Sequence, residues 1–327
     1  MNRRSMLIGA AALTTALSGI ATPDFAAAQQ RVFVGIATGG TGGTYYPLGG
    51  MLAQLISNNA ELEGRRISAT AETGNASVAN AGLLARGEIE TAFIAADILD
   101  AAYRGVNQFD GNAAPNIRAL GSLYPETVQL VARAGAGIES FGDLKGKSVS
   151  SGSPGSGQWQ LLGDLLESHG LTREDVREDH SSFAQSVDKV KDGNLDASLI
   201  TAGVPTASIT ELANGFDIKI IPLSGDEIAA LQEAQPYYAS VTLPAGAYRG
   251  VDSDVETLAV RAIWATHADL DDDIAYAMVK ALYENTETLA QVHVMGSQIS
   301  LETALESISV PLHPGAERYY REVGLIE

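Results

Sequence analysis

The sequence predicts a protein of two α/β lobes joined by two crossing strands, and three observations support this fold class. Short β-branched runs alternate with segments that carry apolar residues at helical spacing, which is typical of a mainly parallel sheet. Two glycine-rich loops, at residues 38–44 and 151–157, each follow a strand-like run and precede a helix-like segment. Two extended apolar runs, at residues 120–133 and 257–266, lie far apart in the sequence. We expect these two runs to cross between the lobes.

The predicted elements repeat one local plan of strand, loop and helix. In the first helix the apolar residues fall on one face, namely Leu48, Met51, Leu52, Leu55 and Ile56. In the helix after the second glycine-rich loop that face consists of Leu161, Leu162, Leu165 and Leu166. Predicted strands cover residues 31–37, 66–71, 147–150, 196–201 and 218–223. Predicted helices cover residues 45–58, 78–85, 158–169, 182–192, 205–214 and 274–294.

Three carboxylates, Asp271, Asp272 and Asp273, precede the last predicted helix. Negative charge at the start of a helix is stabilised by the helix macrodipole. A calcium-binding loop would require alternating oxygen ligands and a central glycine, and this segment has neither. We therefore interpret the acidic run as a helix start.

If the two apolar runs cross between the lobes, one lobe is built from both ends of the chain. The predicted lobe I then consists of residues 29–124 together with residues 245–327, and the predicted lobe II consists of residues 125–244. The length of 327 residues favours two domains over one.

Residues 1–28 have the composition of a secretory signal peptide. Arg3 and Arg4 form a short basic start, residues 6–20 are uncharged and mostly apolar, and alanines 26–28 provide a small-residue cleavage pattern. The apolar run is shorter than the ~20 residues of a membrane anchor. We expect export to the periplasm by the general secretory or the twin-arginine route, and a mature chain that starts at Gln29.

The composition excludes several classes of function. The chain has no cysteine, so disulfides, thiolate zinc sites and cysteine nucleophiles are excluded. Its formal net charge is −19 at pH 7, and such a surface repels nucleic acid and anionic lipid. An anionic ligand would therefore need local groups that attract it against the mean field of the protein.

The glycine-rich loops are candidate anion sites. A loop of this kind that leads into a helix directs several backbone N–H groups to one point, where the helix dipole adds positive potential. Hydroxyl groups of Thr41, Thr44, Ser153 and Ser156 add further hydrogen-bonding capacity, and neither loop contains lysine or arginine. The alternative is that both loops are only tight turns. Because ligands bind beyond the carboxyl ends of parallel strands, the two loops together favour facing walls of one cleft.

Motifs for nucleotide binding and catalysis are missing. Neither loop ends in the Gly-Lys-Ser/Thr of a P-loop, and the third glycine of a dinucleotide fingerprint is replaced by Tyr45. The five histidines do not show the spacing of zinc proteases, and no Gly-x-Ser-x-Gly elbow is present. We therefore expect a binding protein without catalytic residues, metal or cofactor.

Several segments resemble one known family. Residues 38–50, with the sequence Thr-Gly-Gly-Thr-Gly-Gly-Thr-Tyr-Tyr-Pro-Leu-Gly-Gly, closely resemble the N-terminal signature of the TAXI-type receptors of tripartite ATP-independent periplasmic (TRAP) transporters. The similarity extends over essentially the whole mature chain. Its other segments are residues 120–126, 141–149, 153–157, 201–206 and 311–316.

The resemblance implies a type II periplasmic binding-protein fold, in which two lobes close on a ligand and a TRAP membrane permease is the partner. It implies a small anionic solute, such as a glutamate-like or 2-oxoglutarate-like carboxylate, and ion-gradient-driven uptake by the permease. The positions expected to bind this solute are Gly40, Thr41, Gly42, Gly43, Thr44, Tyr45, Gly74, Ser77, Asp97, Tyr124, Ser153, Gly155, Ser156, Gly157, Thr201, Gly203, Pro205 and Thr206.

The chain departs from the family pattern at two places. A glutamine is common two residues before the Asp that corresponds to Asp97, but Ala95 stands there. The usual Gly-Ser-Val-Glu-Asn is Ala-Ser-Val-Ala-Asn at residues 76–80. The loss of polar groups indicates a smaller or less polar ligand. The same fold would also serve a sensor that presents a solute to a membrane kinase, whereas a periplasmic hydrolase is disfavoured by the missing catalytic sets.

Overall fold

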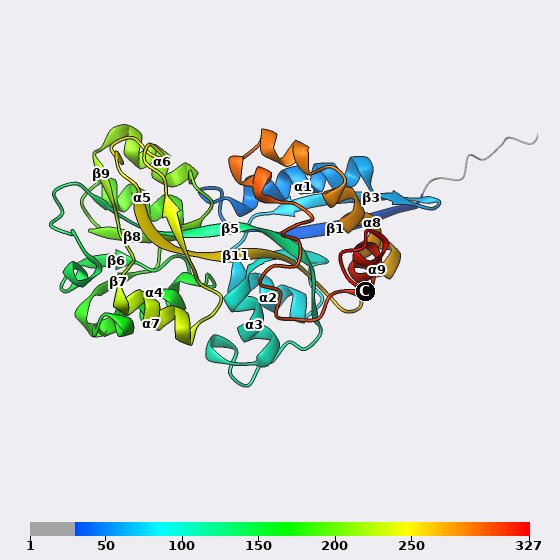
Figure 1. Ribbon diagram of the computed structural model, residues 1–327, viewed down its shortest axis with the longest axis horizontal. Helices are drawn as coiled ribbons and strands as arrows, with labels where there is room; N and C mark the ends of the chain where they lie inside the picture. Colours follow the sequence, from blue (N-terminus) through cyan, green and yellow to red (C-terminus); the bar gives the residue numbers. More distant parts are fainter. Residues whose placement is uncertain (1–29) are drawn as a thin grey trace, which may run out of the picture.

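The computed structural model describes residues 30–327, and these residues form two α/β parts joined by long strands (Figure 1). We call the parts lobe I and lobe II after the boundaries expected above, which stay a prediction. The expected signal peptide, residues 1–28, and the expected mature start at Gln29 lie outside the described residues. Among the described residues, no helix is long and apolar enough to cross a membrane.

The first part of lobe I repeats the expected order of strand, loop and helix. Strand β1 pairs in parallel with both β3 and β4. Helix α1 lies on one face of the sheet and helices α2 and α3 lie on the other (Figure 1). The bounds are β1 Gln30–Ala37, α1 Tyr45–Asn59, β2 Glu61–Leu62, β3 Arg65–Glu72, α2 Ser77–Ala85, β4 Thr91–Ala95, α3 Ala96–Arg104 and the 3₁₀ turn η1 Asn107–Phe109.

Lobe II has the same plan around a smaller sheet, in which β6 pairs in parallel with β7 and β8. Its bounds are η2 Phe141–Leu144, β6 Ser148–Ser150, α4 Gln158–Ser168, η3 Arg173–Asp175, β7 Arg177–Asp179, α5 Phe183–Lys191, β8 Ala197–Ala202, α6 Ala207–Gly215, β9 Ile218–Ile221, α7 Asp226–Ala234 and β10 Ala239–Leu243. The helices predicted at residues 158–169, 182–192 and 205–214 are confirmed to within one or two residues at each end.

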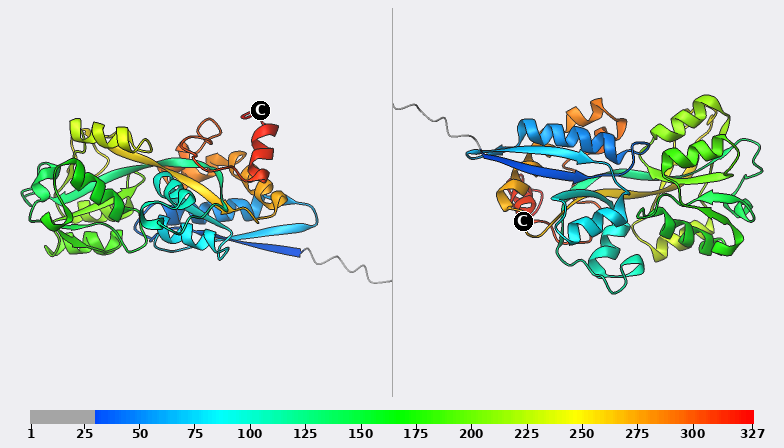
Figure 2. Two further views of the ribbon diagram at one scale, coloured as in Figure 1. Left: turned by 90° about the horizontal axis from the view of Figure 1, so that it is seen from below. Right: turned by 180° about the vertical axis from the view of Figure 1, so that it is seen from behind.

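Two long strands, β5 (Ile117–Arg133) and β11 (Val255–His267), connect the lobes (Figures 1 and 2). They pair antiparallel with each other. Strand β11 also pairs with β4 of lobe I, and the second half of β5 pairs with β8 of lobe II. The expected crossing runs are therefore confirmed as strands. The sheet is mainly parallel within each lobe, apart from the antiparallel pair of β2 and β3, and it is antiparallel at the crossing. It is therefore more mixed than the sequence predicts.

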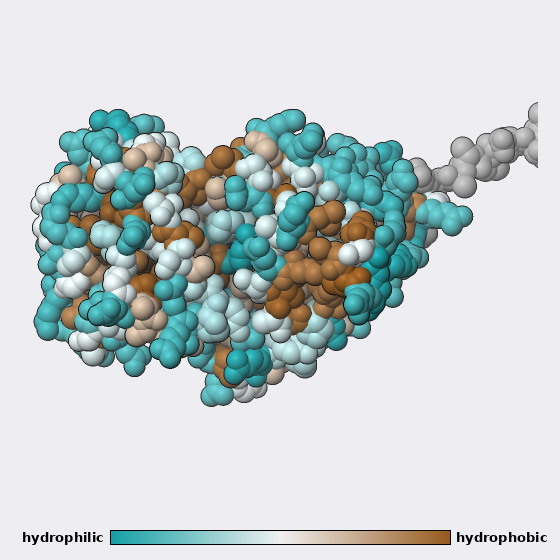
Figure 3. Space-filling model, viewed as in Figure 1, coloured by the Kyte–Doolittle hydropathy of each residue, from teal (hydrophilic) through white to brown (hydrophobic). Residues whose placement is uncertain are grey.

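Each lobe has a buried apolar core. The core of lobe I contains Trp264, Phe93 and Tyr319, which come from β11, β4 and α9 (Pro314–Glu322) and are almost fully buried. A further apolar cluster spans the junction and includes residues of α3, α4 and β5. The space-filling view shows that the surface narrows between the lobes (Figure 3). The two lobes therefore share apolar packing across a narrow waist.

The helix predicted at residues 274–294 is wrong in length. Helix α8 (Asp272–Tyr283) is followed by two 3₁₀ segments, η4 (Thr286–Gln291) and η5 (Val294–Gln298). The side-chain amide of Asn285 donates to the carbonyl of Ala281 at 2.9 Å and replaces the next backbone donor. Gly296 lies against the backbone of Leu289, where a β-carbon would come within 2.3 Å. The chain therefore turns back on itself instead of continuing the helix.

Candidate functional site

A cavity lies between the lobes, at the carboxyl ends of the parallel strands, where open α/β sheets bind their ligands. Its volume is about 190 Å³. Lobe I lines it with the loops that follow β1, β3 and β4, and lobe II lines it with the loops that follow β6 and β7 and with the end of β8. Glu126 of β5 and Val260 of β11 contribute from the crossing strands. The parallel strands of both lobes thus end at one small cavity.

Five helices begin at this cavity, namely α1, α2, α3, α4 and α5. Helices α1, α2 and α4 have no side-chain hydrogen bond that caps their first turn. First-turn N–H groups other than that of Ala79, which donates to the carbonyl of Gly155, are left for another acceptor. The helix dipoles add positive potential at the same place. This arrangement favours an anion in the cavity.

Buried hydroxyl groups at the cavity have no partner. The Ser156 and Thr201 hydroxyls are buried and make no hydrogen bond within the protein, and both residues line the cavity. An unpaired buried hydroxyl costs free energy, and a bound ligand that supplies an acceptor or donor removes this cost. Ser156 follows β6 and Thr201 ends β8, the strand that pairs with β6, so both hydroxyls are offered by lobe II.

A carboxyl group, Glu126, lies in the wall of the cavity and is almost fully buried. The Tyr45 hydroxyl donates to its Oε2 at 2.7 Å. Ser77 Oγ accepts from the backbone N–H of Ala95 and lies 3.5 Å from the Tyr45 hydroxyl. Because the Tyr45 hydroxyl donates its proton to Glu126, the Ser77 hydroxyl is the donor in its contact with Tyr45. Burial raises the pKa of Glu126 to about 8, so its carboxyl group is mostly protonated at neutral pH.

A second carboxyl group, Asp97, lies in the first turn of α3. The Tyr238 hydroxyl, which comes from lobe II, donates to its Oδ2 at 2.7 Å. The other oxygen, Oδ1, is buried without a partner. Burial is the main cause that raises the pKa of Asp97, and the hydrogen bond from Tyr238 opposes it. Asp97 and Tyr238 therefore link the two lobes at the edge of the cavity.

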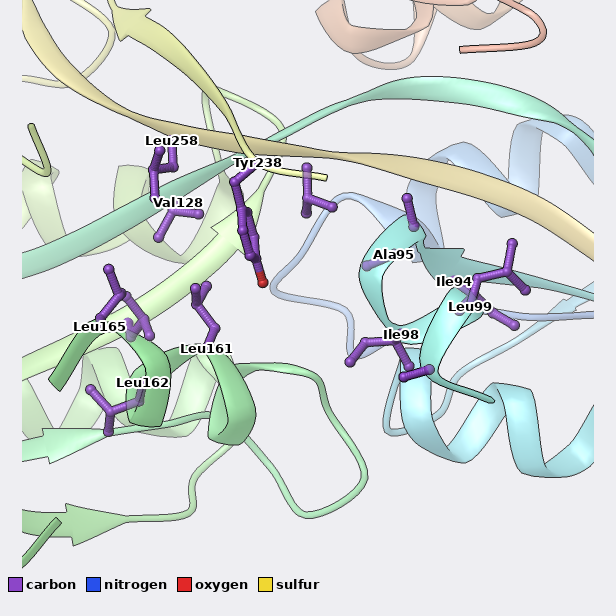
Figure 4. Packing of buried hydrophobic residues seen from close by; sticks show 14 of the residues in the cluster. Ile94, Ala95, Ile98, Leu99, Val128, Leu161, Leu162, Leu165, Tyr238 and Leu258 are labelled. Atoms are coloured by element: carbon purple, nitrogen blue, oxygen red, sulfur yellow. The ribbon is translucent and has the colours of Figure 1, made fainter. Parts of the chain in front are cut away.

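Apolar side chains form the remaining wall. Ile98 of α3 and Leu161 of α4 approach the cavity from opposite lobes, and the Tyr238 hydroxyl points into the space between them (Figure 4). Val260 and Phe183 complete this part of the lining. No lysine, arginine or histidine is among the described residues that line the cavity. A ligand thus meets helix N-termini, hydroxyls, two carboxyl groups and an apolar surface.

The lobes contact each other around the cavity. Backbone N–H groups of Ala79 and Ser208 donate across the lobes to the carbonyls of Gly155 at 3.0 Å and Gly42 at 3.2 Å. The backbone N–H of Gly203 donates to Thr44 Oγ1 at 3.0 Å. The structure is therefore a closed arrangement of the two lobes, and each glycine-rich loop reaches the opposite lobe.

Thirteen of the residues expected to bind the solute are brought together in the lining: Gly40, Thr41, Gly42, Gly43, Thr44, Tyr45, Gly74, Ser77, Asp97, Ser153, Ser156, Gly157 and Thr201. Five others lie outside it. Tyr124 is buried in the core of lobe I, and Gly155 packs against α2 of lobe I. Gly203, Pro205 and Thr206 belong to the connection between β8 and α6, which does not line the cavity.

The sequence interpretation missed Glu126, Tyr238 and the start of α5 at Ser182 and Phe183. Glu126 had a recognisable signal, since it is the only carboxylate of β5, a strand of mostly apolar residues. Tyr238 had none, because it lies in an irregular segment whose position depends on how the lobes meet.

The fold and the cavity together define a periplasmic binding-protein fold, in which two α/β lobes enclose a small site. Residues 36–324 match the NMT1-like family over most of the chain. The chain belongs to this family.

Solved structures share the fold at low sequence identity. A protein from Bordetella bronchiseptica RB50 has a TM-score of 0.56 at 14% identity, covering 89% of this chain and 98% of that one. PhnD1 from Prochlorococcus marinus (MIT 9301), solved in complex with methylphosphonate, has a TM-score of 0.54 at 10% identity, covering 90% and 99%. The periplasmic aliphatic sulphonate binding protein SsuA from Escherichia coli has a TM-score of 0.47 at 15% identity, covering 89% and 83%.

Proposed function

We propose that this protein is a periplasmic solute receptor that closes on a small carboxylate and delivers it to a membrane transporter. The observation that carries the proposal is the enclosed cavity of about 190 Å³ between two lobes, at which five helices begin. This volume is below the ~300–1,000 Å³ of sites for drug-sized ligands, so it fits a small metabolite. The sequence of residues 1–28, which is typical of a signal peptide, supports export.

The anionic character of the solute is inferred from the helix N-termini. Without a cation in the lining, the uncapped first turns of α1, α2 and α4 and the hydroxyls of Ser156 and Thr201 are the groups that remain to hold a carboxylate. Each charge-assisted hydrogen bond to such a group contributes about 1.5–3 kcal/mol. The complex of PhnD1 with methylphosphonate gives an example of a small anion bound by a protein of this fold.

For the partner, we propose a TRAP permease, and the support is the resemblance of residues 38–50 and five further segments to TAXI-type receptors. The expected solutes are glutamate-like or 2-oxoglutarate-like carboxylates. Uptake into proteoliposomes that contain the neighbouring permease tests the partner. Uptake driven by an ion gradient supports a TRAP system, uptake driven by ATP points to a different transporter class, and a neighbouring kinase without uptake points to a sensor.

Native mass spectrometry of the protein released from the periplasm tests the receptor function itself. We expect an intact mass that begins at or near Gln29 and a retained small acid, or, if the site is empty, binding of added carboxylates in calorimetry. Small-angle scattering of the ligand-free and saturated protein should show a smaller radius of gyration on binding. Binding of only solutes that lack a carboxylate group would overturn the proposed ligand class, and an unchanged radius of gyration at saturation would overturn the closure of the lobes on the ligand.

A further inference from the structure

The cavity carries more acidic groups than a receptor for a simple dianion requires. Glu126 and Asp97 both line it, and neither has a basic partner. Arg261 follows Val260, which lines the cavity, but its side chain lies on the other face of β11. There its guanidinium group contacts Ser122 and Glu306. A ligand with two negative charges would therefore meet two carboxyl groups and no cation. A ligand that also carries a positive group would itself bring the cation that these carboxyl groups lack.

One carboxyl oxygen of Glu126, Oε1, is left for a ligand. Oε2 accepts the hydrogen bond from Tyr45, which leaves Oε1 for the ligand. The titratable groups that face Glu126 are Tyr45 from α1, Tyr124 from β5, Asp97 from α3 and Tyr238 from the segment before β10, and none of them is basic. No protein group is thus available to neutralise Glu126 when it is ionised.

We infer that Glu126 is the specificity-determining residue of the site, and that it selects α-amino acids over the corresponding 2-oxo acids by binding the ligand ammonium group. The inference rests on the proposed function and names the ligand class of the same cavity. The ligand carboxylate lies at the uncapped helix N-termini, the ammonium group contacts Glu126, and the side chain extends toward Ile98 and Leu161.

Binding then has a definite proton balance. Before binding at neutral pH, Glu126 holds a proton, because burial raises its pKa to about 8. The ammonium group keeps its own protons, so Glu126 must ionise to form the ion pair, and its proton goes to the solvent. A 2-oxo acid offers only acceptors, so Glu126 stays protonated and no proton is released.

Calorimetry with matched pairs tests the selection. The pairs are L-glutamate with 2-oxoglutarate and L-leucine with 4-methyl-2-oxopentanoate, measured at pH 7 with the full mature protein. We expect the better-bound pair to favour its amino member in the parent. Glu126→Gln should weaken that member at least about 30-fold, since it breaks a buried charge pair. The oxo member should change less than about threefold, because the amide also donates a hydrogen bond.

Glu256→Gln is the matched control, because Glu256 is an exposed carboxylate of β11 outside the cavity. Its affinities should equal those of the parent. Thermal unfolding of the ligand-free variants checks that each is folded. Repeating the titrations between pH 6 and 8 in buffers of different ionisation enthalpy counts the protons. The parent should release close to one proton per amino acid at pH 6 and fewer at pH 8, and Glu126→Gln should release none.

The outcomes separate this inference from the proposed function. Tighter binding of the oxo acid, weakened by Glu126→Gln, would mean that Glu126 donates to an acceptor, which overturns the inference and leaves the carboxylate receptor standing. Equal affinities in parent and variant would also overturn it. If neither member of any pair binds the parent, both the amino-acid selection and the expected solute class are wrong.

Discussion

The loop between β1 and α1 and the loop between β6 and α4 both bring glycines to the cavity, yet their backbones differ. Gly40, Gly42 and Gly43 of the first loop have no positive φ, whereas Gly152 and Gly155 of the second have φ values of 80° and 90°. At Gly42 and Gly43 of the first loop glycine is needed because the opposite lobe comes close. In the second loop glycine is needed because the backbone adopts a conformation that other residues rarely adopt. At Gly155 the opposite lobe is also close, since a β-carbon there would lie 3.2 Å from Cβ of Ala79. Similar sequences therefore meet two different physical demands.

The largest effect is expected for Gly42→Val. A β-carbon at Gly42 would lie 3.2 Å from the backbone nitrogen of Ala184 and 3.4 Å from Cβ of Ser208, both in lobe II. The variant should fold normally when ligand-free but close poorly, with affinity reduced about 10- to 100-fold, the cost of overpacking a tight contact. Calorimetry with the identified solute and thermal unfolding check this. Gly50→Val, with open space around it, is the control, and unchanged affinity of Gly42→Val would remove the steric argument.

Gly155→Val should lower the stability of the ligand-free protein as well as hinder closure of the lobes. Its φ of 90° is strained for valine in any arrangement of the lobes, so the free energy of unfolding should fall by about 1–3 kcal/mol even without ligand. Denaturant titration measures this. Gly142→Val, in the same lobe but without a positive φ, should be close to neutral. If Gly155→Val loses affinity but no stability, the two loops do not differ as described.

A smaller effect is expected for Thr44→Val. Thr44 is the N-cap residue of α1 but makes no side-chain cap bond, and its hydroxyl instead accepts from the backbone N–H of Gly203 across the lobes. Losing this bond should lower affinity about fivefold, equivalent to about 1 kcal/mol, and leave ligand-free stability unchanged. Asp271→Ala removes the side-chain cap of α8, so it should lower ligand-free stability and leave affinity unchanged. A loss of ligand-free stability in Thr44→Val would contradict this assignment.

The smallest effect concerns Ala76, which precedes α2 with φ 64° and ψ −148°. This conformation is normally adopted by glycine, so Ala76→Gly should raise the free energy of unfolding by about 1 kcal/mol. Ala85→Gly, in the last turn of the same helix, should lower it by a similar amount. Chemical denaturation of both variants provides the comparison. A destabilised Ala76→Gly would show that the backbone is not strained there.

Local sequence patterns predicted the elements whose formation depends on nearby residues. The alternation around β1, α1, β6 and α4 and the apolar runs of β5 and β11 were read correctly because periodicity reports directly on burial. The helix at residues 274–294 was overestimated, since its apolar spacing continues past Asn285. The side-chain contact from Asn285 to Ala281 that ends α8 has no signature in periodicity.

The cavity was predictable only in part. Loops that end parallel strands must meet at one edge of a sheet, so the residues around 40, 75 and 155 could be grouped from sequence. The contact between Tyr238 and Asp97 joins residues 141 positions apart and depends on how the lobes close. Glu126 could not be assigned to the cavity from sequence, because sequence does not show whether a carboxyl group on a crossing strand faces the cavity or the solvent.

The sheet order has a consequence for how the chain matures. Strand β11 lies between β4 and β5, although it is synthesised more than a hundred residues after both. Until β11 is present, the edges of β4 and β5 that pair with it have no neighbouring strand. The N-terminal and C-terminal segments of lobe I then cannot join into one sheet. Lobe I and the ligand site can therefore form completely only after residues 255–267 are present, whereas the helices and parallel strands of lobe II precede them in the chain.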